Sequence, residues 1–76
     1  MKNKTFTEIW KGLNKNDRGN LRIEIITRTR ITDMGLNAWT SGRRNPSRYT
    51  DQKAVAESVN KVLGIEAKVE ELFPKV

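Results

Sequence analysis

The first stripe of apolar residues lies near the start of the chain and has helical spacing. Its members, at i, i+3, i+4 and i+7, are Phe6, Ile9, Trp10 and Leu13. This spacing puts them on one face of an amphipathic helix, and Thr5 with Glu8 has the spacing of a capping box. We therefore predict a helix over about residues 5–14, with Trp10 as a core anchor, followed by a polar break over residues 14–19.

The central stretch, residues 21–47, contains apolar positions that cannot all face one side of a single helix. They are Ile25, Ile26, Ile31, Leu36 and Trp39. The gaps between them are one, five, five and three residues, which departs from the repeat of about 3.6 residues in a continuous helix. Two helices that fold across each other, with Ile31 in the bend, account for the pattern. The sequence thus predicts a helix-turn-helix with its core over about residues 21–42.

The first of these two helices follows the polar break. Asn16 or Asp17 is its expected N-cap, and the helix runs to about Arg28. Its buried residues are expected to be Leu21, Ile25 and Ile26. The β-branched residues here also suit a strand, but the chain has no second strand pattern for it to pair with, and an isolated strand is not stable. We therefore expect a helix.

The second helix of the pair is expected over about residues 32–41. Thr32 is a good N-cap, and Gly42 is suited to end the helix. Leu36 and Trp39 are expected to face inward. The predicted helix can lie in the major groove of DNA, as the second helix of a helix-turn-helix does.

A further helix is expected over about residues 47–63, with Ser47 as its cap and Gly64 as its end. Its apolar positions at helical spacing are Val55, Val59, Val62 and Leu63. A short last turn over about residues 67–72 follows.

The last apolar residues extend beyond that turn. We expect Ile65 and Leu72 in the core, and leave open whether Phe73 and Val76 cover the core or contact a second copy. The whole pattern predicts an all-α fold of four helices and a terminal turn, in one domain over residues 1–76.

Composition excludes several classes of function. The chain has no cysteine and no histidine, so it has no disulfide, no thiolate metal site and no imidazole base. No closely spaced pair of carboxylates falls in a stretch that suggests a pocket. We therefore expect neither enzymatic activity nor a cofactor, metal or small-molecule substrate. No apolar run approaches the roughly 20 residues of a membrane span. The polar start has no signal-peptide core, so we expect a cytoplasmic, nucleoid-associated protein.

The positive charge is concentrated in one part of the chain. The net charge is +6, and all seven arginines lie within residues 18–48, opposed there only by Glu24 and Asp33. The lysines lie outside this segment, interleaved with acids. Arginine suits phosphate groups and guanine edges, whereas mixed lysine and glutamate usually serve solubility. This clustering favours a polyanionic partner.

The predicted helix over residues 32–41 has a polar face suited to reading base edges. Asn37 can pair with adenine, Asp33 with a cytosine amine and Met34 with a thymine methyl group. The candidate base-reading residues are Thr32, Asp33, Met34, Asn37, Ala38 and Ser41. The expected contacts to the DNA backbone are Arg22, Arg28, Arg30, Arg43, Arg44 and Arg48. Any helix of this length has a solvated face, so the flanking arginines carry much of this interpretation.

Residues 21–73 resemble the Xre/Cro-type helix-turn-helix regulators, which have a lambda-repressor-like all-α fold of about five helices. The resemblance rests on the apolar framework of the two central helices, the Trp-Thr-Ser-Gly-Arg-Arg-Asn-Pro-Ser segment and the tail from Val62 to Pro74. Small bacterial and mobile-element forms look closest. The resemblance implies a sequence-specific binder of double-stranded DNA, usually a homodimeric transcriptional regulator. By position, it implies base contacts from residues 32–34, Asn37 and Ala38, and backbone contacts from Arg22, Arg43 and Arg44.

The chain departs from this family at the turn and in the packing between the two helices. The family usually has a glycine in the turn, where this chain has Arg30. A left-handed arginine costs roughly 1 kcal/mol, so we expect either a different turn or an arginine held by a phosphate. Ile26 stands where the family prefers alanine, and Gly35 is expected to leave space for it.

A protein-interaction adaptor is the alternative to DNA binding. Such a protein, antitoxin-like or a phage inhibitor, would place its arginine face on an acidic protein. RNA binding has less support, because no exposed pair of aromatic residues is available for base stacking.

Overall fold

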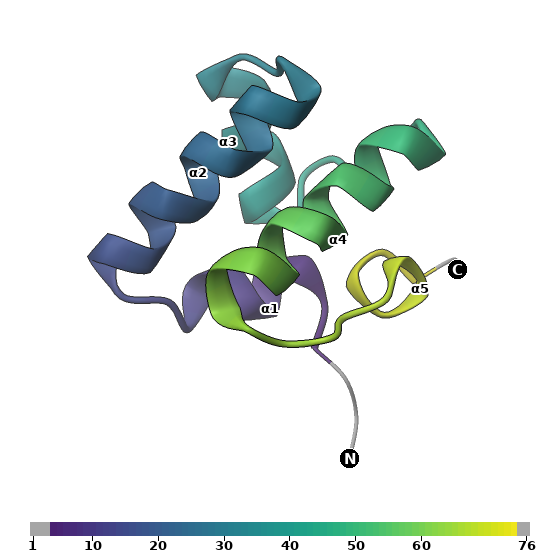
Figure 1. The fold of residues 1–76 in the computed structure, drawn as a ribbon. Coiled ribbons are helices and arrows are strands. Elements are labelled where there is room, and N and C mark those ends of the chain that lie inside the picture. Colours follow the sequence, from purple (N-terminus) through teal and green to yellow (C-terminus); the bar gives the residue numbers. More distant parts are fainter. Residues whose placement is uncertain (1–3, 75–76) are drawn as a thin grey trace.

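A computed structural model describes residues 4–74, and these residues form a compact all-α structure. Five helices and no strand are present in this range: α1 (Phe6–Lys11), α2 (Lys15–Thr29), α3 (Asp33–Ser41), α4 (Tyr49–Leu63) and α5 (Val69–Leu72). The long helices α2 and α4 lie side by side, and α3 passes behind them (Figure 1). Helices α1 and α5 close the lower end of the molecule in this view. The all-α prediction is confirmed. No helix within residues 4–74 is long and apolar enough to span a membrane.

Helix α1 begins as its sequence predicts and ends earlier. The Thr5 hydroxyl accepts from the backbone N–H of Glu8 at 3.3 Å, and the Thr5 N–H donates to the Glu8 carboxylate at 3.0 Å. This is the expected capping box. The helix stops at Lys11 and not near Asn14, because Asn14 caps the next helix.

Helix α2 begins earlier than expected. Its N-cap is Asn14, whose side-chain oxygen accepts from the N–H of Asp17 at 2.8 Å. The prediction of Asn16 or Asp17 as the cap is therefore wrong, and so is the polar break through Gly19. The residues after Asn14 are polar because the first turn of α2 is exposed.

Helix α4 also begins differently. Ser47 is not its cap: the N-cap position is Arg48, which makes no side-chain capping bond. The Gln52 amide donates instead to the carbonyl of Pro46 at 2.7 Å, and so fastens the preceding loop to the first turn of α4. The predicted end of the helix at Gly64 is confirmed.

The core draws on all five helices. Its buried apolar residues are Phe6, Leu21, Ile25, Leu36, Trp39, Val55, Ala56, Val59, Leu72 and Phe73. The expected inward orientation of Leu36 and Trp39 is confirmed. Ile65 was expected in the core but is 41% exposed. Phe73 fills the lower end of the core, where its ring centroid lies 5.7 Å from that of Phe6. Val76 lies outside the described residues.

The connection between α2 and α3 is a tight three-residue turn centred on Ile31. Arg30 has a left-handed backbone, with φ of 59°, and its N–H donates to the carbonyl of Ile26 at 2.7 Å. The expected alternative of a different turn is therefore wrong, and the phosphate contact of Arg30 stays a prediction. A Cβ on Gly35 would lie 2.7 Å from Cγ1 of Ile31. The missing side chain of Gly35 thus makes room for Ile31, and not for Ile26 as expected.

Candidate nucleic-acid interface

Helix α3 presents one polar side to the solvent because its other side is fixed in the core. Thr32 caps the helix with a bond from the Gly35 N–H at 3.1 Å, and Gly42 ends it with φ of 81°. Both predicted bounds are confirmed. The candidate residues on the exposed side are Thr32, Asp33, Met34, Asn37 and Ser41, with Ala38 half-buried among them. Met34 is 82% exposed, so its side chain is accessible to a partner.

Arg22 of α2 connects to this side of α3 through two hydrogen bonds. Its guanidinium donates to the Asp33 carboxylate at 2.9 Å and to the side-chain oxygen of Asn37 at 3.0 Å. One cation from α2 therefore holds two side chains that lie one turn apart on α3. The sequence offered no signal for this contact, because the contact depends on how the two helices cross.

Arg43 and Arg44 border α3 at its C-terminal end. The N–H of Arg44 donates to the carbonyl of Ala38 at 3.2 Å, which folds the loop back along the helix. The Arg43 guanidinium donates to the hydroxyl of Ser41 at 3.3 Å. An open hollow of about 470 Å³ lies between the two arginines and α3, and its apolar lining includes Met34. The surface here combines an apolar floor with a basic rim.

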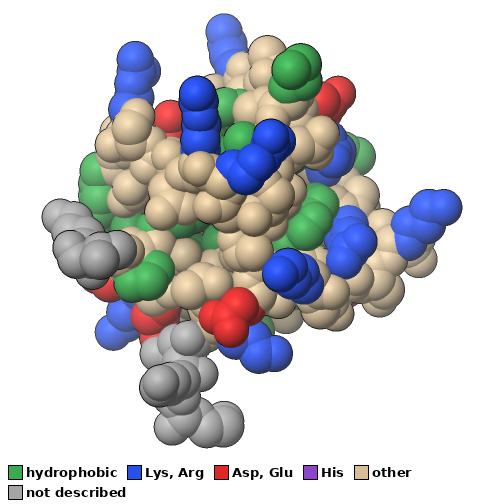
Figure 2. Space-filling model, turned by 180° about the vertical axis from the view of Figure 1, so that it is seen from behind, with side chains coloured by type: hydrophobic (Ala, Val, Ile, Leu, Met, Phe, Trp, Pro, Cys, Tyr) green, Lys and Arg blue, Asp and Glu red, His purple; other side chains and the backbone are tan. Residues whose placement is uncertain are grey.

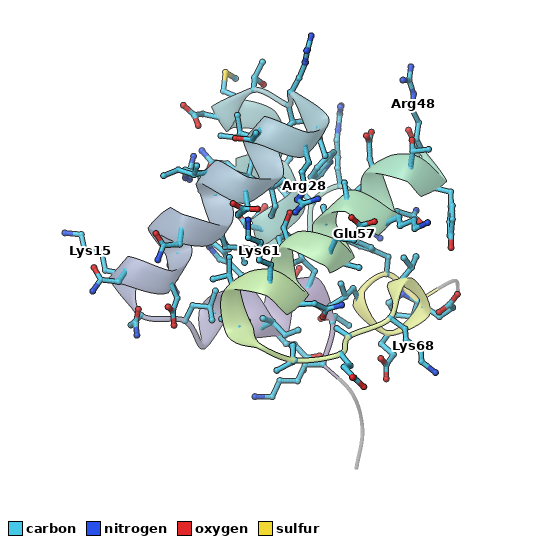
Figure 3. The ribbon with its side chains drawn as sticks, viewed as in Figure 1. Lys15, Arg28, Arg48, Glu57, Lys61 and Lys68 are labelled. Atoms are coloured by element: carbon cyan, nitrogen blue, oxygen red, sulfur yellow. The ribbon has the colours of Figure 1, made fainter. Side chains whose placement is uncertain are left out.

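Five arginines form no ion pair within the described part of the chain. One of them, Arg18, bonds to backbone carbonyls of α1. The other four are Arg30, Arg43, Arg44 and Arg48. Arg30 precedes α3, and Arg43 and Arg44 follow it. Arg48 stands at the start of α4 (Figure 3). In Figure 2, which views the molecule from the side of α3, basic side chains project around the surface and acidic ones show mainly near its edges. We call these four residues the unpaired arginines.

Arg28 lies apart from the unpaired arginines. It was expected on the DNA backbone, but it forms ion pairs with Glu24 of its own helix at 3.4 Å and with Glu57 of α4 at 3.2 Å. Lys61 extends the row by pairing with Glu24 at 3.4 Å. We call these four residues the charge ladder. It lies between α2 and α4, on the front of the view in Figure 3. We therefore omit Arg28 from the proposed interface.

Arg18 supports the fold at the other end of α2. Its guanidinium donates to the carbonyls of Trp10 and Lys11 at 3.1 and 3.2 Å, which serves the C-terminal end of α1. It also stacks over the half-buried Trp10 ring, 5.8 Å from its centroid. Trp10 packs against the core, as expected.

The exposed side of α3 carries mainly polar side chains. Among residues 4–74, no cluster of histidine, cysteine and acidic side chains could hold a metal ion. The side chains on this side of α3 offer hydrogen-bond donors, a few hydrogen-bond acceptors and one apolar group. No protein family, curated protein or solved structure matches the chain significantly. The assignment to the Xre/Cro-type family therefore stays a prediction from the sequence.

Proposed function

We propose that the protein binds double-stranded DNA in a sequence-specific manner and acts as a transcriptional regulator. In this proposal α3 enters the major groove, and the unpaired arginines contact phosphates on either side of it. The observation that carries the proposal is the position of these cations. Arg30 precedes an exposed polar helix and Arg43 and Arg44 follow it, without carboxylates in ion-pair distance among the described residues.

Electrostatics supports this proposal. A cation that is already paired gains little from a phosphate, because it must first lose its partner. Arg43 and Arg44 lie next to α3 and form no such pair, so they can neutralise phosphates and release counterions. Such contacts position a protein on the duplex, whereas the side chains of α3 would read base edges.

The size of the domain favours a homodimer on DNA. The longest dimension of the described residues is 29 Å between Cα atoms. Two half-sites one helical turn apart are separated by roughly 34–36 Å, so one copy cannot place α3 in both. A single small module also buries too little DNA surface for tight specific binding.

Fluorescence anisotropy against a random-sequence duplex pool, measured at several salt concentrations, tests the proposal. We expect binding that weakens steeply with salt. For Arg43→Ala/Arg44→Ala we expect roughly tenfold weaker binding and a slope of log affinity against log salt that is smaller by about 2.

The matched control is Lys61→Ala/Lys68→Ala, which removes the same charge away from α3 (Figure 3). We expect this variant to bind almost like the wild type, within about threefold. If both double variants lose affinity equally, the binding is a general effect of net charge. If the wild type binds no duplex at low salt, the proposal is wrong.

The alternative is a protein-interaction adaptor that holds an acidic segment. The hollow beside Met34 favours it, because an apolar floor with arginines at its rim suits a segment with one apolar and several acidic side chains. Failure of duplex binding, together with retained folding, would favour this second function.

A further inference from the structure

The contact between Arg22 and Asn37 fixes the direction of an amide group on the surface of α3. A guanidinium has only N–H donors, so the atom of Asn37 that faces it at 3.0 Å must be the side-chain oxygen. The NH₂ group of Asn37 consequently points away from Arg22. Asn37 is an exposed residue, so this NH₂ group is available to a partner.

This orientation changes which base Asn37 suits. Adenine requires an asparagine to accept from its N6 amine and to donate to N7. Here the oxygen of Asn37 already accepts from a cation, and the adenine amine would be a second donor beside that positive charge. Guanine presents two acceptors, N7 and O6, at its major-groove edge. The free NH₂ group of Asn37 can donate to that edge, and Arg22 holds it in this orientation.

Asp33 does not reverse this preference. Its carboxylate is the other partner of Arg22, at 2.9 Å, and the ion pair offsets its negative charge. Asp33 remains 73% exposed, so it keeps lone pairs for a donor such as the cytosine amine. A negative charge offset in this way also repels DNA phosphates less than a lone carboxylate on α3 would.

We infer that Arg22 is a positioning residue that makes Asn37 select guanine over adenine. This inference rests on the proposed DNA binding, and it goes beyond it by naming the base. It also replaces the adenine contact expected from the residue type of Asn37 alone. The competing explanation is that Arg22 only ties α2 to α3, which would affect stability and leave base preference unchanged.

Selection from a randomised duplex pool tests the inference. The base pair that Asn37 contacts is identified as the one whose preference is lost in Asn37→Ala. We expect the wild type to enrich guanine there. Arg22→Met keeps the aliphatic stem and removes every donor, and it should shift the ratio of guanine to adenine towards adenine by at least about fivefold, the lower end for one good base contact.

Two further variants separate positioning from a structural role. Arg22→Lys can keep the ion pair with Asp33, but a single ammonium cannot bridge both side chains as the guanidinium does. We expect Arg22→Lys to be more stable than Arg22→Met and still to shift the preference from guanine towards adenine. In the Asn37→Ala background, Arg22→Met should cause no further shift at that base pair. A uniform loss of affinity without a change in preference would overturn the inference, as would adenine enrichment by the wild type.

The contact itself can be tested without DNA. In ¹⁵N spectra of the free protein, Arg22→Met should move the side-chain amide resonances of Asn37. Those of Asn60, whose amide bonds both ways to the backbone of Ala67, should stay in place. Unmoved Asn37 resonances contradict the inference independently.

If the resonances move but no duplex binds, the proposed function fails and the inference about base choice fails with it. If duplexes bind without a shift in preference, only the inference fails.

Discussion

The arginine of the charge ladder and the unpaired arginines belong to the same short segment of sequence but differ in their surroundings. Arg28 lies between two carboxylates at 3.2 and 3.4 Å. Arg43 and Arg44 have no carboxylate within ion-pair distance among residues 4–74. The first arrangement satisfies a charge within the fold, and the second leaves charge for a partner. A cluster of arginines in a sequence therefore overstates the binding surface until the ion pairs are known.

Among the single substitutions that compare the two kinds of arginine, those at the turn between α2 and α3 give the largest expected effect on duplex affinity. Arg30→Gly removes a left-handed arginine that costs roughly 1 kcal/mol, and the freedom of glycine in the unfolded chain offsets part of this gain. We expect the free energy of unfolding to rise by about 0.5 kcal/mol in urea titrations. Duplex affinity should fall by about fivefold, because one phosphate contact is lost.

The control for this prediction is Arg30→Asn, since asparagine also tolerates the left-handed region. Arg30→Asn should lose as much duplex affinity as Arg30→Gly, and its free energy of unfolding should not fall below that of the wild type. Unchanged affinity in both variants would place Arg30 outside the interface and weaken the contrast between the two sets of arginines.

The charge ladder should show the opposite behaviour. Arg28→Ala removes two exposed ion pairs, which we expect to lower the free energy of unfolding by about 0.5 kcal/mol. Duplex affinity should stay within about twofold at moderate salt, because the charge lies away from α3 and is screened. A loss of affinity as large as that of Arg43→Ala/Arg44→Ala would contradict the separation of the two faces.

Helix α1 gives the smallest expected effect, and it belongs to neither set of arginines. The backbone N–H and then the hydroxyl of Thr5 bond to the Glu8 carboxylate and hold its pKa below the usual 4.5. A carboxyl with a lowered folded pKa stabilises the fold above pH 4.5, and this contribution is lost as the pH falls through the folded pKa.

Glu8→Gln tests this contribution, since glutamine also completes a capping box. Unfolding should become slightly less sensitive to pH below 4.5, with no change in duplex affinity at neutral pH. Thermal unfolding measured across this pH range would show the difference. An identical pH dependence in the variant and the wild type would argue against the Thr5 contact as its cause.

Local patterns in the sequence predicted most of the fold. The stripe from Phe6 to Trp10 and the caps at Thr32 and Gly42 act within one helix each, and the structure has them as expected. Leu13 lies beyond the end of α1. The start of α2 was missed because Asn14 and Asn16 are both good caps, and only the packing of α1 decides between them. The burial of Phe73 depends on where α5 meets α1, which no local pattern indicates.

The candidate site was predictable only in part. The exposed side of α3 follows from helical periodicity, because Leu36 and Trp39 fix the opposite side. The ion pairs do not follow from it. Arg28 and Glu57 are 29 residues apart, and Arg22 and Asn37 are 15 apart. These contacts decide which arginines are available and which way an amide points, and they arise only once the helices have packed.

The most direct test of the two-face account is a ¹⁵N chemical-shift titration with a duplex taken from the bound fraction of the random pool. We expect the largest amide shifts in α3 and in the loop of Arg43 and Arg44, with a smaller response at Arg30. The amides of Glu57 and Lys61 in the charge ladder should not move. If the shifts centre instead on the charge ladder, or leave α3 unmoved while the duplex binds, the assignment of the DNA interface to α3 is wrong.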